Sequence, residues 1–216
     1  MNPRFLLLCT ATQAEMDCLL PLPSFVHPLV CGVGIAATLH SLYTYQINNT
    51  LPKLVIQAGL AGLYTHEPDP QGIYVISSER YADLGLESGQ EPRTLTLYPP
   101  HQPIFYAHKQ YWSSLQNNPV QQAQGLTVQC CTGTETTQQM MSKAHNLEPG
   151  EFYTESMEGM PLAEWAEKLS LPWLQIRSIS NRVGKRSITA HSIERSLAEL
   201  GMYFKKIDWN LLCNSI

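Results

Sequence analysis

Two glutamates and a methionine in the stretch 153–160 (YTESMEGM) have types and a spacing that could do chemistry. Glu155 and Glu158 stand three positions apart, and Met157 directly precedes the second. One interpretation is helix capping, because an acidic side chain in a first helical turn is favoured by the helix dipole. The other is a pocket wall for a polyhydroxylated ligand, because an ionised carboxylate only accepts hydrogen bonds and a thioether is an adaptable apolar surface.

Glycines follow three of the predicted strands, within 32–34, within 59–62 and at Gly133. In open α/β sheets, ligands bind beyond the carboxyl ends of strands, and glycine lets the backbone approach a ligand closely. Gly59 is therefore a candidate ligand contact. Each glycine alone also fits a tight strand-to-helix turn. The chain lacks the third glycine of a dinucleotide fingerprint and contains no P-loop motif.

Short apolar runs alternate along the chain with longer runs at helical spacing. The predicted strands are 5–11, 26–32, 54–58, 72–77, 126–131 and 173–180, and the predicted helices are 35–46, 104–115, 136–144, 157–169 and 193–206. Continuously apolar strands are usually buried on both faces, so helices are expected to cover both sides of the sheet. The pattern predicts one α/β domain over residues 1–216, with a central mixed β-sheet flanked by helices.

The composition excludes several classes of protein. A formal charge of −4 with no cluster of Lys and Arg argues against a nucleic-acid surface, and the densest basic stretch, 182–186 (RVGKR), is expected to be a solvated loop. The first apolar run, 5–9, is shorter than the roughly 7 to 15 residues of a signal-peptide core. No run approaches the roughly 20 apolar residues of a membrane span. The six cysteines form no disulfide or metal-binding pattern, so we expect a cytoplasmic protein without membrane partner, metal or cofactor.

Four segments occur in the order and spacing of the nucleoside phosphorylase and nucleosidase superfamily. They are ATQAEMDCLL (11–20), LVIQAGLAG (54–62), ESMEG (155–159) and LPWLQIRSISN (171–181). More narrowly, the chain resembles the futalosine hydrolases, which SSERYADLGLESG (77–89) also resembles, and next to them the methylthioadenosine/adenosylhomocysteine nucleosidases. The likeness covers about residues 5–200. ESMEG and RSISN are its specific parts, whereas the glycine turns are generic.

The resemblance implies hydrolysis of the N-ribosidic bond of a purine nucleoside. The expected reaction converts futalosine to hypoxanthine and dehypoxanthinyl futalosine, a step of menaquinone biosynthesis. Two alternatives are methylthioadenosine/adenosylhomocysteine nucleosidase activity and activity on both substrates. A third, of another class, is a nucleoside-binding protein without catalysis. The resemblance also implies a homodimer.

The same resemblance implies roles for individual residues. Glu158 would accept hydrogen bonds from the ribose 2′ and 3′ hydroxyls, and Met157 would pack against the sugar. Glu15 aligns with the carboxylate that activates water, although a charge in a first helical turn also explains it. Arg177 would hold this part of the site together, and a buried arginine needs a carboxylate partner, for which Glu15 is our candidate. Glu155 has no such assignment and is expected to be a capping or surface residue.

Asn181 is an informative departure from the adenine-specific nucleosidases, which carry aspartate there. An asparagine donates and accepts hydrogen bonds at once, which suits a 6-oxopurine such as hypoxanthine. The alternative is a strand-end asparagine selected for its turn preference. Backbone groups of 135–137, among them Thr137, are expected at the base, but the aromatic stacking residue of related nucleosidases is missing at Thr136. Lys53 is the one cationic residue between Gly32 and Gly62 other than histidine, which favours water over phosphate as the nucleophile.

Overall fold

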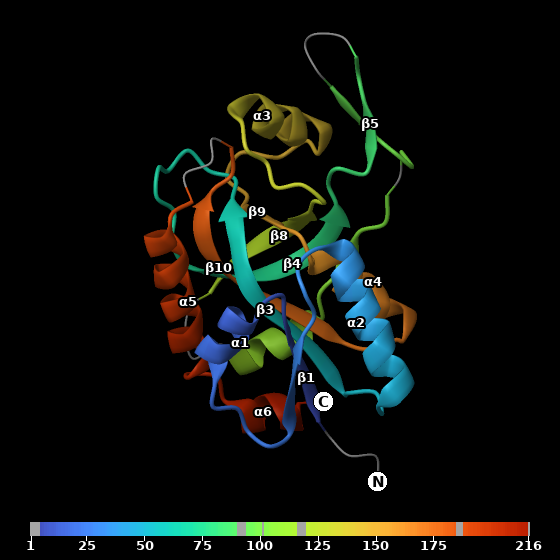
Figure 1. Cartoon of the computed structure of the whole chain (residues 1–216), viewed down its shortest axis with the longest axis vertical. Coiled ribbons are helices and arrows are strands. Elements are labelled where there is room, and N and C mark those ends of the chain that lie inside the picture. Colours follow the sequence, from blue (N-terminus) through green and yellow to red (C-terminus); the bar gives the residue numbers. More distant parts are fainter. Residues whose placement is uncertain (1–4, 90–93, 101, 116–119, 185–187, 216) are drawn as a thin grey trace.

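The computed structural model describes residues 5–89, 94–100, 102–115, 120–184 and 188–215 (Figure 1). Its strands are β1 (Leu6–Thr10), β2 (Val26–Val30), β3 (Leu54–Leu63), β4 (Ile73–Tyr81), β5 (Gly85–Glu87), β6 (Leu95–Leu97), β7 (Phe105–Tyr106), β8 (Gln121–Thr127), β9 (Tyr153–Ser156) and β10 (Trp173–Arg182). Its helices are α1 (Gln13–Leu19), α2 (Ile35–Asn48), α3 (Glu135–Ala144), α4 (Gly159–Lys168), α5 (Ala190–Phe204) and α6 (Trp209–Asn214), with a 3₁₀ helix η1 (Lys109–Leu115). Within the described part of the chain, no helix has the length and apolarity needed to cross a membrane.

The main sheet is mixed and partly closed on itself. Its order is β10-β4-β8-β9-β3-β1-β2, and β10 also pairs with β3, so that β3, β9, β8, β4 and β10 form a ring. β3 pairs in parallel with β1 through its first half and antiparallel with β9 through Gly62 and Leu63. The remaining hairpin, β5–β6, is a separate two-stranded sheet. The predicted single α/β domain with a central mixed sheet is confirmed.

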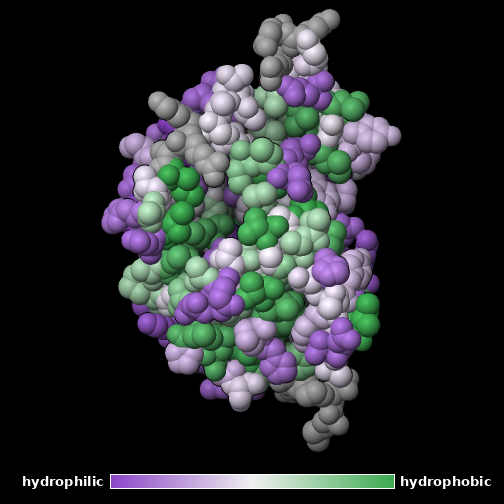
Figure 2. Space-filling model, viewed as in Figure 1, coloured by the Kyte–Doolittle hydropathy of each residue, from purple (hydrophilic) through white to green (hydrophobic). Residues whose placement is uncertain are grey.

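The strand β1 shows how the sequence builds a layer of helices on each face. Leu6 and Leu8 belong to an apolar cluster shared with α1, α5 and α6, whereas Leu7 and Cys9 belong to one shared with α2 and α4. Alternate side chains of a strand point to opposite faces, so a strand covered on both sides is apolar at every position. Figure 1 shows the two groups of helices on opposite sides of the sheet. In Figure 2, apolar residues also gather across the middle of the visible face.

Three predicted elements differ from the structure. The strand predicted at 126–131 is β8, which ends at Thr127, because the amides of Gln129 and Cys130 donate to the Asp83 carboxylate (2.6 and 3.3 Å) instead of to a strand. The helix predicted at 104–115 is the short strand β7 followed by η1. The strand predicted at 54–58 continues to Leu63, because β10 and β9 go on pairing with it. Gly59 and Gly62 therefore lie within a strand and not in a turn.

The contact between α1 and α5 leads to a first prediction. A Cβ at Gly201 in α5 would lie 2.5 Å from the backbone carbonyl oxygen of Cys18 in α1. Alanine would favour the helix by up to about 1 kcal/mol, but the clash forces the two helices apart. We expect Gly201→Ala to lower the free energy of unfolding in urea by about 1 to 2 kcal/mol. Gly89→Ala is the control, since nothing lies within 4 Å of a Cβ there; a Gly201→Ala protein as stable as wild type would contradict the prediction.

Candidate active site

Helix α1, strand β3 and the segments that precede α2 and α4 are joined by long-range hydrogen bonds to two glutamates. The backbone N–H of Leu60 in β3 donates to Glu15 Oε1 in α1 (3.0 Å), and the N–H of Gly34 before α2 donates to Glu158 Oε1 before α4 (2.8 Å). These contacts join segments that are 45 and 124 residues apart in sequence. The long-range hydrogen bonds therefore assemble two buried carboxylates over the end of β3.

Glu15 caps its own helix and also faces the strand. Its Oε2 accepts from the N–H and hydroxyl of Thr12 (2.8 and 2.9 Å), which completes a capping box at the start of α1. A Cβ at Gly59 would lie 2.8 Å from Glu15 Oε1 and 2.9 Å from Arg177 Nη1. The missing side chain at Gly59 thus leaves the space in which carboxylate and guanidinium approach each other. Both interpretations of Glu15, the cap and the pocket residue, describe the same side chain.

Arg177 is buried within β10, and amides receive its hydrogen bonds. Its Nη2 donates to Gln57 Oε1 (2.6 Å) and to Gln175 Oε1 (3.2 Å). The ion pair expected with Glu15 is not among those of the described residues, because Nη2 is engaged by the two glutamines while Nη1 lies over Gly59. Glu15 thus lies near Arg177, as expected, but the two side chains do not form a direct ion pair.

Glu158 is the residue that precedes α4, yet its side chain makes no cap hydrogen bond and reaches the Gly34 N–H instead. Gln57 Nε2 donates to its backbone oxygen (3.0 Å). Burial raises the pKa of Glu158; the nearby Arg177 charge and the Gly34 hydrogen bond oppose that shift, and Glu15 adds to it. The Met157 methyl carbon lies 3.9 Å from a Cβ position at Gly34. The side chain of Glu158 therefore does not cap α4, and its role as a pocket wall stays a prediction.

Asn181 lies near the end of β10, where a register shift after Ile179 pairs it with Gly62 of β3. Its Oδ1 accepts from the Ser180 hydroxyl (2.9 Å), and its Nδ2 donates to the backbone oxygen of Arg182 (2.9 Å). The Nδ2 atom lies 3.2 Å from a Cβ position at Gly62. The amide is thus at the same end of β3 as Gly59, three residues further along the strand.

An ion pair brings the start of α3 to this strand end. Arg182, expected in a solvated loop, is part of β10 and pairs with Glu135, while Lys185 and Arg186 lie outside the described residues. The N–H of Thr137 donates to the Thr134 hydroxyl (3.0 Å) as part of the helix cap. The structure therefore places Thr137 in the first turn of α3, with its N–H already engaged.

Glu79 is a fully buried carboxyl that the sequence analysis did not single out. It fills the space left by two glycines, Gly125 and Gly159, and accepts from the Thr127 hydroxyl (2.8 Å). That hydroxyl in turn accepts from the N–H of Met160 in α4 (2.7 Å). Burial raises the pKa of Glu79 to about 7, against the opposing charge of Arg177 and the Thr127 hydrogen bond. The two glycines that leave space for this carboxyl group are 46 and 80 residues further along the sequence, so no local pattern marks the site.

Glu155 is also buried, so the expectation of a capping or surface residue is wrong. Its Oε1 accepts from the Thr132 N–H (2.8 Å), and its Oε2 accepts from the Thr132 hydroxyl (2.6 Å) and the Tyr64 hydroxyl (3.1 Å). The reason is the sheet: β9 is paired on both sides, with β3 and with β8, so its side chains do not reach solvent. Three donors make this buried carboxylate tolerable.

Comparison with known proteins places the chain in a family. No protein-family model matches it. A futalosine hydrolase of Streptomyces coelicolor is 30% identical over 184 residues, which are 80% of this chain and 74% of that protein. The chain belongs to the nucleosidase-like members of the nucleoside phosphorylase superfamily.

Two further comparisons agree with this nucleosidase-like assignment. A 5′-methylthioadenosine/S-adenosylhomocysteine nucleosidase of Colwellia psychrerythraea is 28% identical over 165 residues, 73% of this chain and 67% of that protein. The native structure of a futalosine hydrolase of Helicobacter pylori superposes with a TM-score of 0.76 at 13% identity, covering 99% of each chain. The second likeness concerns the fold.

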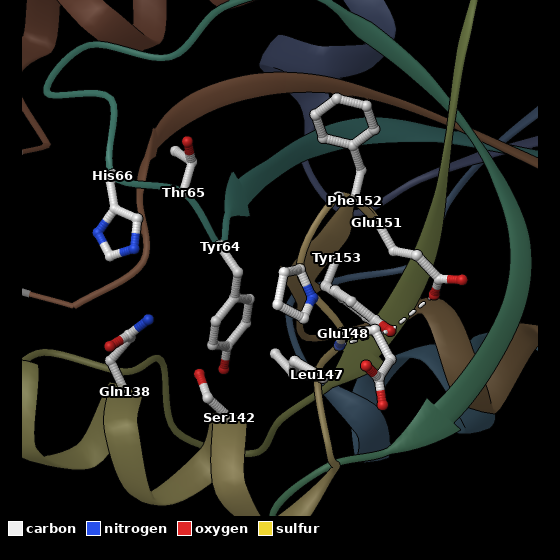
Figure 3. A pocket seen from close by; sticks show the side chains of 12 residues that line it. Tyr64, Thr65, His66, Gln138, Ser142, Leu147, Glu148, Glu151, Phe152 and Tyr153 are labelled. Carbon is white, nitrogen blue, oxygen red and sulfur yellow. Dashed lines mark hydrogen bonds between the residues drawn. The ribbon is translucent and has the colours of Figure 1, made fainter.

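A cavity of about 430 Å³ lies between the segment after β3, helix α3 and the segment 147–153 (Figure 3). Its wall includes Tyr64, which follows β3, Gln138 and Ser142 of α3, and Tyr153 of β9. The Tyr153 hydroxyl donates to Glu151 (2.8 Å). None of the predicted site residues lines this cavity. Among the described residues, no group of three or more His, Cys, Asp and Glu could hold a metal ion.

Proposed function

We propose that this nucleosidase-like chain hydrolyses the N-ribosidic bond of futalosine, releasing hypoxanthine and dehypoxanthinyl futalosine for menaquinone biosynthesis. The observation that carries the proposal is the meeting of Glu15, Arg177 and Glu158 around Gly59 and Gly34. The reaction requires a base for the water nucleophile and an acceptor for the sugar diol, and two buried carboxylates could supply one each. The futalosine hydrolase of S. coelicolor supports the choice of substrate class.

The proposed chemistry begins at the sugar. As the bond from the anomeric carbon to the purine nitrogen lengthens, the sugar takes on oxocarbenium character and the purine leaves with the bonding electron pair. Glu158 Oε1 accepts from the Gly34 N–H, and in this proposal the carboxylate also accepts from the ribose hydroxyls. Met157 packs against the sugar from its place beside Gly34. These contacts strengthen as positive charge grows, which is where binding energy lowers a barrier.

Glu15 acts as the base toward water. Its Oε1 accepts from the Leu60 N–H and lies against Gly59 beside Arg177 Nη1. The attacking water would be bound by this carboxylate. The water oxygen forms the new bond to the anomeric carbon, its proton passes to Glu15, and the departing purine takes up a proton at nitrogen. The Arg177 charge favours the ionised form of Glu158. Phosphate would meet two carboxylates here, so water is the better nucleophile.

Asn181 reads the base in this proposal. Its position beside Gly62, next to Arg182, which pairs with Glu135 at the start of α3, supports contact with a purine held beyond the sugar. The amide NH₂ would donate to O6 of a 6-oxopurine, and its oxygen would accept from N1–H. Backbone and side-chain groups of Thr137, one turn into α3, would lie along the base.

The first experiment is a substrate panel with purified protein. Futalosine, inosine, methylthioadenosine and adenosine are each incubated with and without phosphate, and free base is quantified by chromatography. The proposal expects hypoxanthine from futalosine at a rate that phosphate does not change. Release of adenine from methylthioadenosine alone would favour the methylthioadenosine/adenosylhomocysteine nucleosidase, and release of base from both futalosine and methylthioadenosine would favour an enzyme with dual activity. A rate that depends on phosphate would favour a phosphorylase. No release from any substrate would favour a nucleoside-binding protein.

Asn181→Asp is expected to shift the base preference. Aspartate lacks the NH₂ group that would donate to O6, and when protonated it can donate a hydrogen bond to N7. The rate with 6-aminopurine substrates should therefore rise relative to the rate with 6-oxopurine substrates. We expect the ratio of kcat/KM for futalosine over methylthioadenosine to fall by about 10-fold or more. Asn49→Asp, at the exposed end of α2, is the matched control. An unchanged ratio would remove Asn181 from base recognition.

The homodimer stays a prediction. Val33, Tyr43 and Ile47, beside Gly34 and along α2, are exposed apolar residues that could be covered by a second copy of the chain. Sedimentation of the purified protein tests it.

A further inference from the structure

Glu155 lies on the row of residues that crosses the sheet at Asn181. Asn181 of β10 pairs with Gly62 of β3, and Gly62 pairs with Glu155 of β9. Directly paired residues point to the same face of a sheet, so Glu155 and Asn181 flank Gly62 on one face. Glu155 thus lies at the end of the proposed site that would hold the purine base. Its carboxylate oxygens accept hydrogen bonds from Thr132 and Tyr64.

The segment 128–134, between β8 and α3, has its amides bound one after another. The Val128 N–H donates to the Ser156 oxygen (2.9 Å), Asp83 receives those of Gln129 and Cys130, and Glu155 receives that of Thr132. The Thr134 hydroxyl then caps α3. Glu155 is buried and belongs to β9, the strand that directly precedes Met157 and Glu158.

We propose that Glu155 is a positioning residue that fixes segment 128–134 and the start of α3 against the purine, at a set distance from the ribose contact made by Glu158. The inference rests on the proposed function. Glu155 does not touch the substrate; it acts through Thr132, to which it is joined by two hydrogen bonds of 2.8 and 2.6 Å. Tyr64 supplies the third hydrogen bond and holds the carboxylate in place.

The chemistry requires a carboxylate and not an amide at this position. Each oxygen of Glu155 accepts from Thr132, and Oε2 accepts from Tyr64 as well. Glutamine has one acceptor oxygen, so its NH₂ group would face a donor of Thr132 or of Tyr64. Burial, and then the Glu155 charge, raise the pKa of Tyr64 well above its usual value, so the phenol keeps its proton and remains a donor.

The cavity in Figure 3 provides a matched pair of tyrosines for the test. Tyr64 and Tyr153 both line it (Figure 3). The Tyr64 hydroxyl donates to Glu155, and the Tyr153 hydroxyl donates to Glu151. Only the first glutamate contacts segment 128–134. Tyr64→Phe and Tyr153→Phe therefore remove the same group from the same cavity wall, but only the first loosens the proposed base contact.

Two measurements are made on Tyr64→Phe, Glu155→Gln and Thr132→Val, with Tyr153→Phe and Thr132→Ser as controls. The first is hydrogen–deuterium exchange of peptides that cover 128–134. The second is kcat and KM for futalosine, together with inhibition by free hypoxanthine. For Glu155→Gln and Thr132→Val we expect exchange in this segment to accelerate, and KM and the hypoxanthine inhibition constant to rise, by about 10-fold or more each. Tyr64→Phe should show a smaller rise, whereas Tyr153→Phe and Thr132→Ser, which keeps the hydroxyl, should behave as wild type.

Equal exchange and equal inhibition constants in Tyr64→Phe and Tyr153→Phe would overturn the inference, as would wild-type behaviour of Thr132→Val. If Glu155→Gln does not fold, the tyrosine and threonine pairs decide. Failure of the proposed function is a separate result: the wild-type protein would release no hypoxanthine from futalosine. The exchange measurement would still show whether Glu155 holds the segment.

Discussion

Replacing Glu15 with glutamine is expected to lower kcat for hypoxanthine release by about 10³-fold, within the roughly 10² to 10⁴ that a positioned base contributes. Glutamine cannot take the proton of the attacking water, and Glu15 is the carboxylate that lies against Gly59 beside Arg177. KM should change by less than about 10-fold, because the ribose contact of Glu158 is kept. Initial rates with futalosine, followed by chromatography of the free base, provide the measurement.

The control for this change lies on the same helix. Asp17→Asn is also a carboxylate-to-amide substitution in α1, but Asp17 is exposed and contacts Gln13. It should leave the rate unchanged. Because glutamine also weakens the capping box with Thr12, thermal unfolding of both variants shows whether the protein remains folded at the assay temperature. A folded Glu15→Gln protein with the wild-type rate would exclude Glu15 as the base.

The residues that the sequence could indicate are those with a local pattern. Glu15 follows an N-cap threonine at the end of a buried strand, and Glu158 stands between a short strand and a helix, so both were expected at this edge of the sheet. The structure brings them together with Arg177, although their roles stay predictions. The fold itself followed from alternating apolar runs, because β1 is apolar on both faces, each of which is covered by helices.

The residues that the sequence could not indicate depend on contacts between distant strands. Glu155 is buried because β9 is paired on both sides within the closed ring, and no pattern in YTESMEGM shows that ring. Glu79 fits only because Gly125 and Gly159, on two other elements, leave space for its carboxyl group. Gly59 was expected in a turn because the sequence does not show which side chains pack against it. In the structure, Glu15 of α1 and Arg177 of β10 fill the space where a side chain at this position would lie.

Replacing Glu79 with glutamine is expected to remove a pH dependence of stability. Burial raises the pKa of Glu79 from 4.5 to about 7 in the folded protein, so at intermediate pH the folded state binds a proton that the unfolded state does not. The folded state is therefore favoured fully below pH 4.5, and this contribution is lost as the pH rises toward 7. The loss amounts to as much as about 3 kcal/mol, since each pKa unit corresponds to about 1.4 kcal/mol.

Glutamine resembles the protonated acid at every pH, so Glu79→Gln should match wild type near pH 5 and exceed it in unfolding free energy at pH 8 by up to that amount. Urea unfolding at pH 5, 6, 7 and 8 measures the difference. Other buried groups with shifted pKa values, Glu155, Glu158 and His145, are present in both proteins, so their contributions cancel in the comparison. Glu194→Gln, on the exposed side of α5, controls for the loss of one charge. A constant difference between Glu79→Gln and wild type across this range would mean that Glu79 remains ionised in the folded protein, with Arg177 as the charge that stabilises it.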